Sequence, residues 1–365
     1  MGKYSQQRCV RIGVIGVGRM GRNHCRVLST MRHTLLVGIS DLDPVAGAQV
    51  AAQYDTTFYP SLDELLSQCD AVIIATPTSA HFRLAMQCLA QGIHLLIEKP
   101  ITTTVAEAEA LVAAATAAQL VVQVGHIERF NPTYTELKHV LDDIQIAAIN
   151  FRRLSPYVGS NTDVDVVLDL MIHDLDLVLD LMQAQPTAIH AVGLAAFSGD
   201  IDHAVTQLTF PAGPLVTMMV SRLTEQKIRA IDVTGLEAYV EGDLLNKSIF
   251  LHRSMTGEYL NYQHSVKYRQ ESMMERLHVP MAEPLFLELQ HFVGAILGQH
   301  PLLVTAQDGL QALQLANQIR TAIRQDLRLI QPPSEQQAHI AWRDIPPNGW
   351  RSLVGRSYQT QGQLS

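Results

Sequence analysis

The fold of the first half of the chain is decided by one stretch near its start, Arg11-Ile12-Gly13-Val14-Ile15-Gly16-Val17-Gly18-Arg19-Met20-Gly21. An apolar run leads into a Gly-x-Gly-x-x-Gly pattern, which is typical of a strand that turns tightly into a helix and binds a dinucleotide. The first glycine makes the bend, the second lets the backbone approach a pyrophosphate, and the third lets the helix pack on the sheet. The pattern predicts a strand over residues 10–15 and a helix over residues 23–31, whose first N–H groups face phosphates.

An acidic residue follows at the distance that this motif requires. The apolar run Leu35–Ser40 predicts a second strand that ends at Asp41. A carboxylate about twenty residues after the glycines binds the adenosine ribose hydroxyls and favours NAD, because it repels the 2′-phosphate of NADP. Arg19 and Arg22 are basic residues near the same turn, so NADP remains an alternative cofactor. A glycine-rich turn that binds no ligand is the purely structural alternative.

Short apolar strands alternate with helices through the first third of the chain. Such alternation predicts an α/β fold with a Rossmann domain over residues 1–127, in which a doubly wound parallel sheet is covered on both faces. Ligands bind beyond the carboxyl ends of such strands. Three segments that directly follow predicted strands are therefore expected at the cofactor edge: Thr76-Pro77-Thr78, Glu98-Lys99-Pro100 and Gly125-His126.

The pattern changes after about residue 146, where polar and apolar residues alternate between turns. This predicts an α+β domain over residues 128–330, with an open, largely antiparallel sheet that has one packed face and one face available for a partner. Two helices are expected at residues 283–297 and 306–324. The Pro-, Gln- and Ser-rich segment 331–365 is expected to be an irregular C-terminal extension.

Bulk properties restrict the classes of function. The 365 residues are 47% hydrophobic and 17% charged, and their formal net charge is −8. A globular protein is therefore expected, and the acidic balance argues against nucleic-acid binding. No signal segment or membrane-spanning run is recognisable, so a cytoplasmic location is expected. The cysteines form no Cys-x-x-Cys pair, so reduced core residues and no metal site are expected; they are Cys9, Cys25, Cys69 and Cys88.

One predicted helix, over residues 164–182, carries a row of ionisable residues. The row recurs at spacings of three or four and consists of Asp165, Asp169, His173, Asp176 and Asp180. These spacings place the row on one stripe of a helix that is otherwise almost entirely apolar. We therefore expect a buried helix whose polar stripe lines a cleft, and a solvated acidic face is the alternative. His173 is the natural proton carrier, and Asp169 is placed to hold its ring.

The segment Glu98-Lys99-Pro100 places a cation at the mouth of the predicted cofactor crevice. Proline restricts the preceding Lys99 to an extended backbone, which helps to fix the direction of its side chain. A surface lysine at a strand end is the alternative.

These motifs occur in the order found in one known family. Together they resemble the glucose-fructose oxidoreductase/inositol dehydrogenase/MocA family over roughly residues 8–330: the glycine fingerprint, Ala75-Thr76-Pro77-Thr78 with His81, Glu98-Lys99-Pro100, and Asp169-x-x-x-His173-x-x-Asp176. Gly125–Pro132 and Asp169–Asp174 look like the branch that oxidises UDP-N-acetylglucosamine at its 3-hydroxyl, where a partner aminotransferase makes the amino sugar used in lipid A. The chain has Met171 where the common family pattern has glycine.

The resemblance implies roles for single residues. Lys99 and His173 would do the acid–base work on the reacting hydroxyl and contact the substrate, and Asp169 would support them. Relatives commonly form dimers or tetramers through the sheet of the second domain, so a homo-oligomer is expected. The set expected to contact NAD comprises Gly16, Gly18, Arg19, Met20, Gly21, Asp41, Thr76, Pro77, His81, Glu98, Lys99 and His126.

The diphosphate of a UDP-sugar needs cations. Arg152 and Arg153 follow a predicted strand over residues 146–151, and we expect one of them to clamp the diphosphate, because guanidinium groups match phosphate geometry. A surface salt bridge is the alternative.

Three functions are compatible with the sequence. The first is NAD-dependent oxidation of UDP-N-acetylglucosamine to its 3-keto form. The second is NAD(P)-dependent oxidation of another sugar, uronate or inositol by the same residues. The third is a dinucleotide-binding sensor without activity, which the joint presence of Lys99, Asp169 and His173 disfavours.

Overall fold

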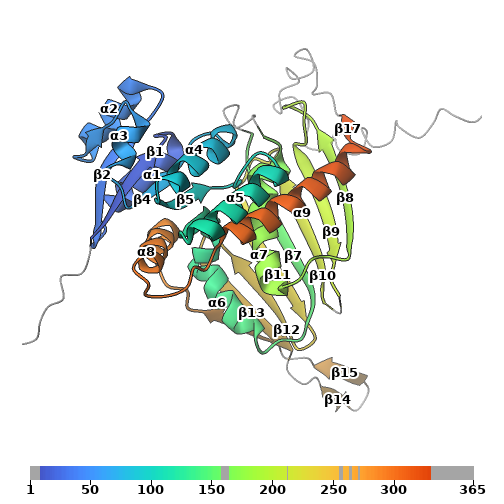
Figure 1. Cartoon of the computed structure of the whole chain (residues 1–365). Helices are drawn as coiled ribbons and strands as arrows, with labels where there is room; N and C mark the ends of the chain where they lie inside the picture. The colour runs from blue at the N-terminus through green and yellow to red at the C-terminus, as the bar shows by residue number, and fades with distance from the viewer. Residues whose placement is uncertain are drawn as a thin grey trace, which may run out of the picture.

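In the computed structural model of the protein, the glycine-rich stretch joins strand β1 of a six-stranded sheet to the helix that follows it (Figure 1). Its strands are β1 (Val10–Ile15), β2 (Thr34–Ser40), β3 (Thr57–Phe58), β4 (Ala71–Ile74), β5 (His94–Glu98) and β6 (Val122–Gly125). Every pair is parallel, and the order is β3-β2-β1-β4-β5-β6. The order reverses between β1 and β4, and doubly wound sheets bind ligands at this point. The structure describes residues 9–157, 164–211, 213–254, 258–262, 265–269 and 272–329, so the predicted extension 331–365 lies outside it.

Helices connect these strands and confirm the predicted Rossmann fold. They are α1 (Arg19–Leu28), α2 (Pro44–Gln53), α3 (Leu62–Leu66), α4 (Thr78–Ala90) and α5 (Val105–Ala118). Local chemistry sets their starts: the Ser61 side chain accepts a hydrogen bond from the backbone N–H of Glu64, and Thr104 forms a capping box with Glu107. Helix α1 begins directly after the glycine turn, earlier than the predicted residue 23.

The second half of the chain forms a nine-stranded sheet. Its strands are β7 (Ile146–Leu154), β8 (Ala188–Ala195), β9 (His203–Thr209), β10 (Leu215–Ser221), β11 (Ile228–Gly235), β12 (Ala238–Asp243), β13 (Ser248–Ser254), β16 (Ser272–Leu277) and β17 (Arg328–Leu329). The order is β16-β13-β12-β11-β7-β10-β9-β8-β17, with β7–β10 and β8–β17 parallel and the other pairs antiparallel. A separate hairpin of β14 (Glu258–Tyr262) and β15 (Ser265–Arg269) follows β13. The prediction of an open, largely antiparallel sheet is confirmed.

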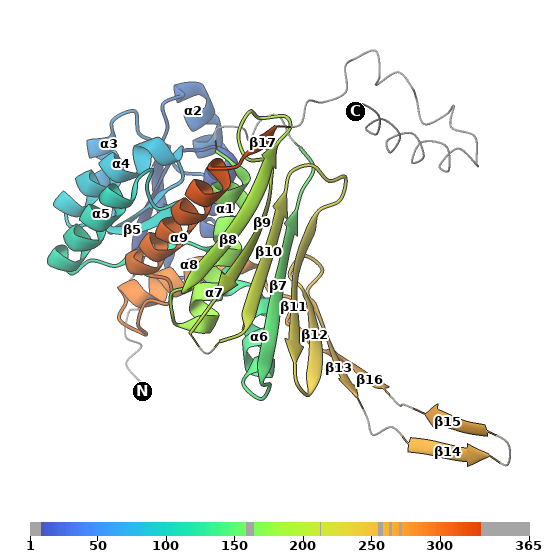
Figure 2. The same ribbon diagram turned by 90° about the vertical axis from the view of Figure 1, so that its right-hand side faces the viewer.

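Helices lie on one face of this sheet, and the opposite face is bare (Figure 2). The helical elements of the second half are η1 (Ile127–Phe130), α6 (Pro132–Leu141), η2 (Val167–Met171), α7 (Ile172–Met182), α8 (Pro284–Ile296) and α9 (Ala306–Arg324). Helix α8 returns to the first sheet, where Leu289 and Phe292 share a core with Ile12 and Val14. This return of α8 is not evident from the sequence. In the part of the chain that the structure describes, no helix is long and apolar enough to cross a membrane.

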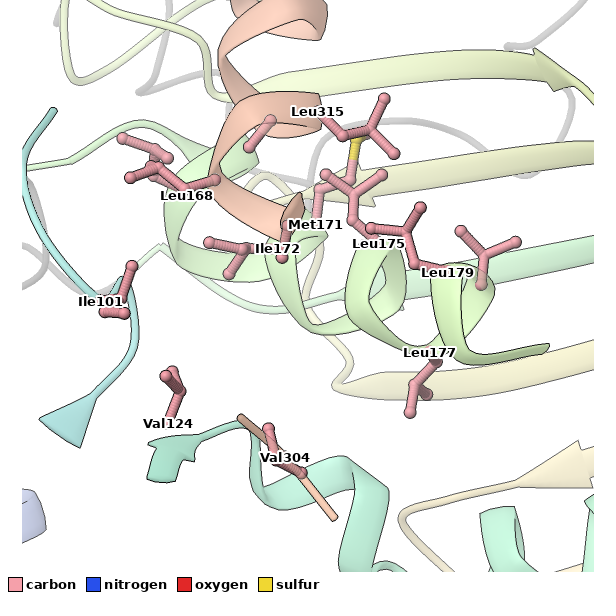
Figure 3. Close-up of a cluster of buried hydrophobic side chains, with 14 of the residues drawn as sticks. Ile101, Val124, Leu168, Met171, Ile172, Leu175, Leu177, Leu179, Val304 and Leu315 are labelled. Carbon is pink, nitrogen blue, oxygen red and sulfur yellow. The ribbon is translucent and has the colours of Figure 1, made fainter. Parts of the chain in front are cut away.

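The helix formed by η2 and α7 is buried nearly all round, as predicted from its apolar composition. Leu175 and Leu177 point to opposite sides of it and are both fully buried (Figure 3). Met171 is also buried, and its sulfur accepts a hydrogen bond from the Thr206 hydroxyl at 3.6 Å. The methionine that replaces the family's glycine therefore fills the core.

The cysteine prediction is correct for three of the four residues. Cys25, Cys69 and Cys88 are buried free thiols, whereas Cys9 is exposed. The prediction is wrong for Cys9 because this residue precedes β1 and lies outside the core.

We expect Leu175→Ala to lower the free energy of unfolding by about 2–5 kcal/mol, because it leaves a cavity in the packed core. Leu245→Ala, at a side chain that is 44% exposed, should change it by less than about 0.5 kcal/mol. Urea unfolding followed by circular dichroism measures both. Equal effects would contradict the assignment of α7 to the core.

Candidate active site

The three glycines of the turn meet three different physical requirements. Gly16 has φ +88°, and a Cβ there would lie 2.7 Å from the Ala75 carbonyl oxygen. A Cβ on Gly21 would lie 1.8 Å from the carbonyl oxygen of Gly16, so the protein's own packing requires these two glycines. A Cβ on Gly18 would meet no atom within 4 Å. The space beside Gly18 therefore suits a ligand, as the dinucleotide motif requires.

The surroundings of the turn fit a dinucleotide. No side chain caps the start of α1, which leaves its first N–H groups available for phosphates. Asp41 follows β2 and accepts hydrogen bonds from the backbone N–H groups of Val17, at 2.6 Å, and Asp43, at 2.8 Å. These bonds fix the carboxylate beside the glycine turn, where the motif places the adenosine ribose.

A cavity of about 420 Å³ lies between the two halves of the fold and is lined from both of them. Met20, Gly125 and Leu170 are among its lining residues. The cavity is strongly cationic, with six basic residues against three carboxylates: Arg19, Lys99, Arg153, Arg222, Lys227 and Arg229 against Glu98, Glu128 and Asp169. Within the described residues, no three His, Cys, Asp or Glu side chains gather in a way that could hold a metal ion.

Lys99 and Asp169 meet in this cavity. Lys99 directly follows β5. Its ammonium donates one hydrogen bond to the backbone carbonyl oxygen of Asp169, at 2.6 Å, and another to Oδ1 of the same residue, at 3.2 Å. Asp169 lies in η2, a π-helical turn, and such turns often occur at functional sites. The Lys99–Pro100 peptide bond is cis. The cation of the first half is thus anchored to the helix of the second.

His173 lines the same cavity one turn further along the helix. Its Nδ1 is buried without a hydrogen-bond partner. Burial and the nearby Lys99 ammonium lower the pKa of His173 well below 6.5, since both disfavour the imidazolium. The imidazole is therefore neutral at pH 7 and able to accept a proton. The Asp169 carboxylate accepts a hydrogen bond from Lys99 through Oδ1, and among the described residues no hydrogen bond joins it to the His173 ring. Support of that ring by Asp169 stays a prediction.

The predicted stripe of five ionisable residues is divided among three places. Asp165 accepts hydrogen bonds from two backbone N–H groups of η2 and pairs with Arg320 at 2.5 Å. Asp176 and Asp180 both pair with the buried Arg129, each at 2.7 Å. Asp169 and His173 alone of the five line the cavity. The single-stripe prediction is wrong because Asp165 precedes η2 and binds the first N–H groups of that turn, while Asp176 and Asp180 lie further along α7 and pair with Arg129.

Two residues of the expected cofactor set, His81 and Glu98, form hydrogen bonds that fix the loops around the cavity. His81 is buried, and its ring nitrogens lie 2.9 Å from the carbonyl oxygens of Pro100 and Thr76. These bonds tie the loop after β4 to the loop after β5, and thereby position Lys99 and Pro77. Glu98 lines the cavity and its Oε1 lies 2.7 Å from Nε2 of the buried His24.

His126 is fully buried after β6. Its Nδ1 lies 4.0 Å from Asp176, and neither ring nitrogen has a hydrogen-bond partner. The lining includes its neighbours Gly125 and Ile127 but not the His126 side chain. Contact between this ring and the nicotinamide stays a prediction.

The two arginines expected at the diphosphate point to opposite faces of the nine-stranded sheet. Arg153 is buried on the covered face, where it lines the cavity and pairs with Glu128 at 2.8 Å and Asp174 at 2.6 Å. Arg152 points to the bare face, pairs with Asp232 at 3.0 Å and is half exposed. The prediction is therefore wrong for Arg152, because neighbours in a strand point to opposite faces.

Several cavity residues of the second half were not predicted from the sequence: Glu128, Lys227 and Arg229, together with Asp174 behind them. The alternation of side chains along a strand, which repeats every two residues, indicates the position of Arg229. This residue lies two positions before Ile231 and four before Val233, which are both buried, so all three share the covered face.

A neutral imidazole and a fixed ammonium at the dinucleotide edge of a doubly wound sheet are suited to moving a hydride and a proton on an alcohol. The fold and site define a dinucleotide-dependent oxidoreductase. Residues 10–126 match the model of an oxidoreductase family with an NAD-binding Rossmann fold, and residues 145–241 match the GFO/IDH/MocA C-terminal domain. The chain belongs to the GFO/IDH/MocA family, and NAD is its cofactor.

Individual relatives match along most of the chain. UDP-N-acetylglucosamine 3-dehydrogenase of Acidithiobacillus ferrooxidans is 33% identical over 314 residues, which cover 86% of this chain and 97% of that protein. A solved structure of this relative has a TM-score of 0.77 at 32% identity and covers 87% and 98% of the two chains. The scyllo-inositol 2-dehydrogenase (NAD(+)) of Bacillus subtilis is 27% identical over 331 residues, or 84% of this chain and 92% of the relative.

Two alanine variants separate the roles of the glycines. Gly21→Ala should lower the free energy of unfolding by about 1–3 kcal/mol or prevent folding, because its Cβ collides with the turn. Gly18→Ala should leave thermal stability near that of the wild type but weaken NAD⁺ binding at least about tenfold, since the methyl group occupies the ligand's space. Thermal unfolding and calorimetric titration with NAD⁺ measure both effects, and unchanged NAD⁺ affinity in Gly18→Ala would contradict the cofactor assignment.

Proposed function

We propose that the protein oxidises the 3-hydroxyl of UDP-N-acetylglucosamine to the 3-keto sugar nucleotide with NAD⁺. The observation that carries this proposal is the cationic cavity in which Lys99 of the first half and His173 of the second half meet. A diphosphate-bearing substrate suits its excess of basic residues. The identity of 33% with an enzyme named for this reaction supports the same substrate.

The residues of the chain supply placement and proton transfer. When bound, NAD⁺ supplies the acceptor for the hydride that leaves the carbinol carbon. The hydroxyl proton must leave at nearly the same time, and the neutral His173 accepts it. Because Nδ1 is buried, we assign this role to Nε2. Lys99 stabilises the developing negative charge on the oxygen, and Asp169 holds the ammonium in place through two hydrogen bonds.

Oxidation of an inositol or another sugar is the second candidate. It is favoured by the relative named scyllo-inositol 2-dehydrogenase, which matches 84% of this chain. The same three residues would serve that reaction, so the excess of cations in the cavity is what distinguishes the two candidates.

We extend the proposal to the setting of the reaction. A 3-keto sugar nucleotide is the substrate that an aminotransferase requires to make a 3-amino sugar for lipid A, so we place the enzyme before such a partner in the cytoplasm. The bare sheet face exposes Val192, Met219 and Tyr239, and we assign it to contact with a second copy of the chain. Such apolar groups on a bare sheet are typical of an association surface.

Incubation with NAD⁺ and a panel of UDP-sugars, free sugars and inositols tests the substrate. We expect NADH absorbance to rise with UDP-N-acetylglucosamine, with a ketone trap present because alcohol oxidation by NAD⁺ is uphill. His173→Ala should lower kcat by about 10²–10⁴-fold. His139→Ala, at a side chain that is 69% exposed, is the matched control and should leave kcat unchanged.

Turnover of free sugars or inositols without turnover of any UDP-sugar would overturn the proposed substrate. No turnover of any compound would favour the sensor.

The pKa of His173 gives a test that is independent of turnover. Removal of the Lys99 charge in Lys99→Met should raise the pKa of His173, because a nearby cation disfavours the imidazolium. Nuclear magnetic resonance of labelled histidine rings measures the titration, with the His173 signal assigned by its loss in His173→Gln. Lys138→Met, whose ammonium pairs with Asp180, is the control. An unchanged or lowered pKa of His173 in Lys99→Met would contradict the placement of the two groups.

A further inference from the structure

Arg229 is a cation of the cavity wall whose guanidinium has no direct carboxylate partner among the described residues. It lies opposite Arg153 in the register of β11 and β7, on the covered face of the sheet. Its guanidinium donates hydrogen bonds to the carbonyl oxygens of Leu154, at 2.7 Å, and Ile228, at 2.8 Å, and to the Ser155 hydroxyl at 2.9 Å. All three acceptors are uncharged. In the described part of the chain, no carboxylate lies within 4.0 Å of the guanidinium, although Arg229 lines the cavity.

The neighbouring Arg153 is in the opposite situation. Its guanidinium forms ion pairs with Glu128 and Asp174, and its side chain is 3% exposed. Removal of either carboxylate would leave a buried charge without a partner, so this cluster ties β7 to η1 and α7. Arg153 is therefore a structural cation with little capacity left for a ligand.

Lys227 adds a second free cation to the same wall. It immediately precedes β11 and lines the cavity, and it has no ion-pair partner among the described residues. Partial desolvation of the ammonium, and then Arg229 and Arg19, lower the pKa of Lys227, while burial and Arg153 lower the pKa of Arg229 to about 10. The wall thus holds positive charges that repel one another until an anion is bound.

We infer that Arg229 and Lys227 form the subsite for the diphosphate of the substrate, in place of Arg152 or Arg153, one of which was expected there from the sequence. The planar guanidinium, already held by three neutral acceptors, suits two phosphate oxygens, and the ammonium acts as a mobile point charge. The inference rests on the proposed function, because it takes the substrate to be a sugar nucleotide. It specifies which residues distinguish a sugar nucleotide from a free sugar.

Calorimetric titration of the NAD⁺-loaded protein with UDP, and separately with uridine, tests this subsite. UDP should bind more tightly than uridine to the wild type. Arg229→Gln and Lys227→Gln should each weaken UDP binding by about tenfold or more, as expected for hydrogen bonds to charged groups, and leave uridine affinity unchanged. Arg152→Gln, on the opposite face of the sheet, is the matched control and should change neither affinity. Arg229→Lys should restore part of the loss.

Unchanged UDP affinity in both glutamine variants would overturn the subsite, as would equal binding of UDP and uridine to the wild type. Lys227 is exposed, so its variant gives a result even where Arg229→Gln fails to fold. The two proposals fail in different ways. If UDP binds through these residues but UDP-N-acetylglucosamine is not oxidised, the proposed reaction is wrong and the subsite stands. If UDP-N-acetylglucosamine is oxidised with an unchanged KM in both variants, the reaction stands and the subsite is wrong.

Discussion

The contact between Lys99 and Asp169 connects the two halves of the molecule at the cationic cavity. One partner directly follows a strand of the parallel sheet, and the other lies in a π-helical turn above it. The hydrogen bond to the Asp169 carbonyl, at 2.6 Å, contributes about 1.5–3 kcal/mol at most in the usual range for charged donors. Its importance therefore lies in position: it holds the ammonium near the imidazole, where its charge adds to burial in lowering the pKa of His173.

The remaining charges of the buried helix follow from one constraint, that a buried carboxylate needs a cation. Asp165 is matched by Arg320, Asp174 by Arg153, and the pair Asp176 and Asp180 by Arg129. Each match attaches the helix to a different neighbour: α9, β7 and η1. The acidic row that resembles an active-site stripe in the sequence thus acts mainly to fix the helix, and Asp169 is its member that reaches the cavity.

How far the sequence predicted this structure depends on the range of the interactions involved. The bounds of β1 and α9 were predicted correctly, because glycine spacing and apolar periodicity act within a few residues. Lys99, His173 and Asp169 were also found, since strand ends and helix faces indicate them. The π turn was not foreseeable from a regular spacing, and the return of α8 to the first sheet depends on packing between distant segments. Arg152 was chosen by its place after an apolar run, whereas the alternation within the strand excludes it.

The placement of Lys99 opposite His173 depends on more than the contact between their neighbours, because the chain crosses between the halves repeatedly. Helix α9 packs on both α5 and α7. Its Gly309 lies so close to β6 that a Cβ there would be 2.7 Å from a methyl group of Val124 and 3.3 Å from Ile101. A bridge between Gln123 and Thr305 joins the start of α9 to the same strand. An element from the end of the chain therefore holds the cofactor sheet and the helix bearing His173 at a fixed separation. Sequence motifs single out Lys99 and His173, but it is this close packing, with glycine at the point of contact, that allows both residues to line one cavity.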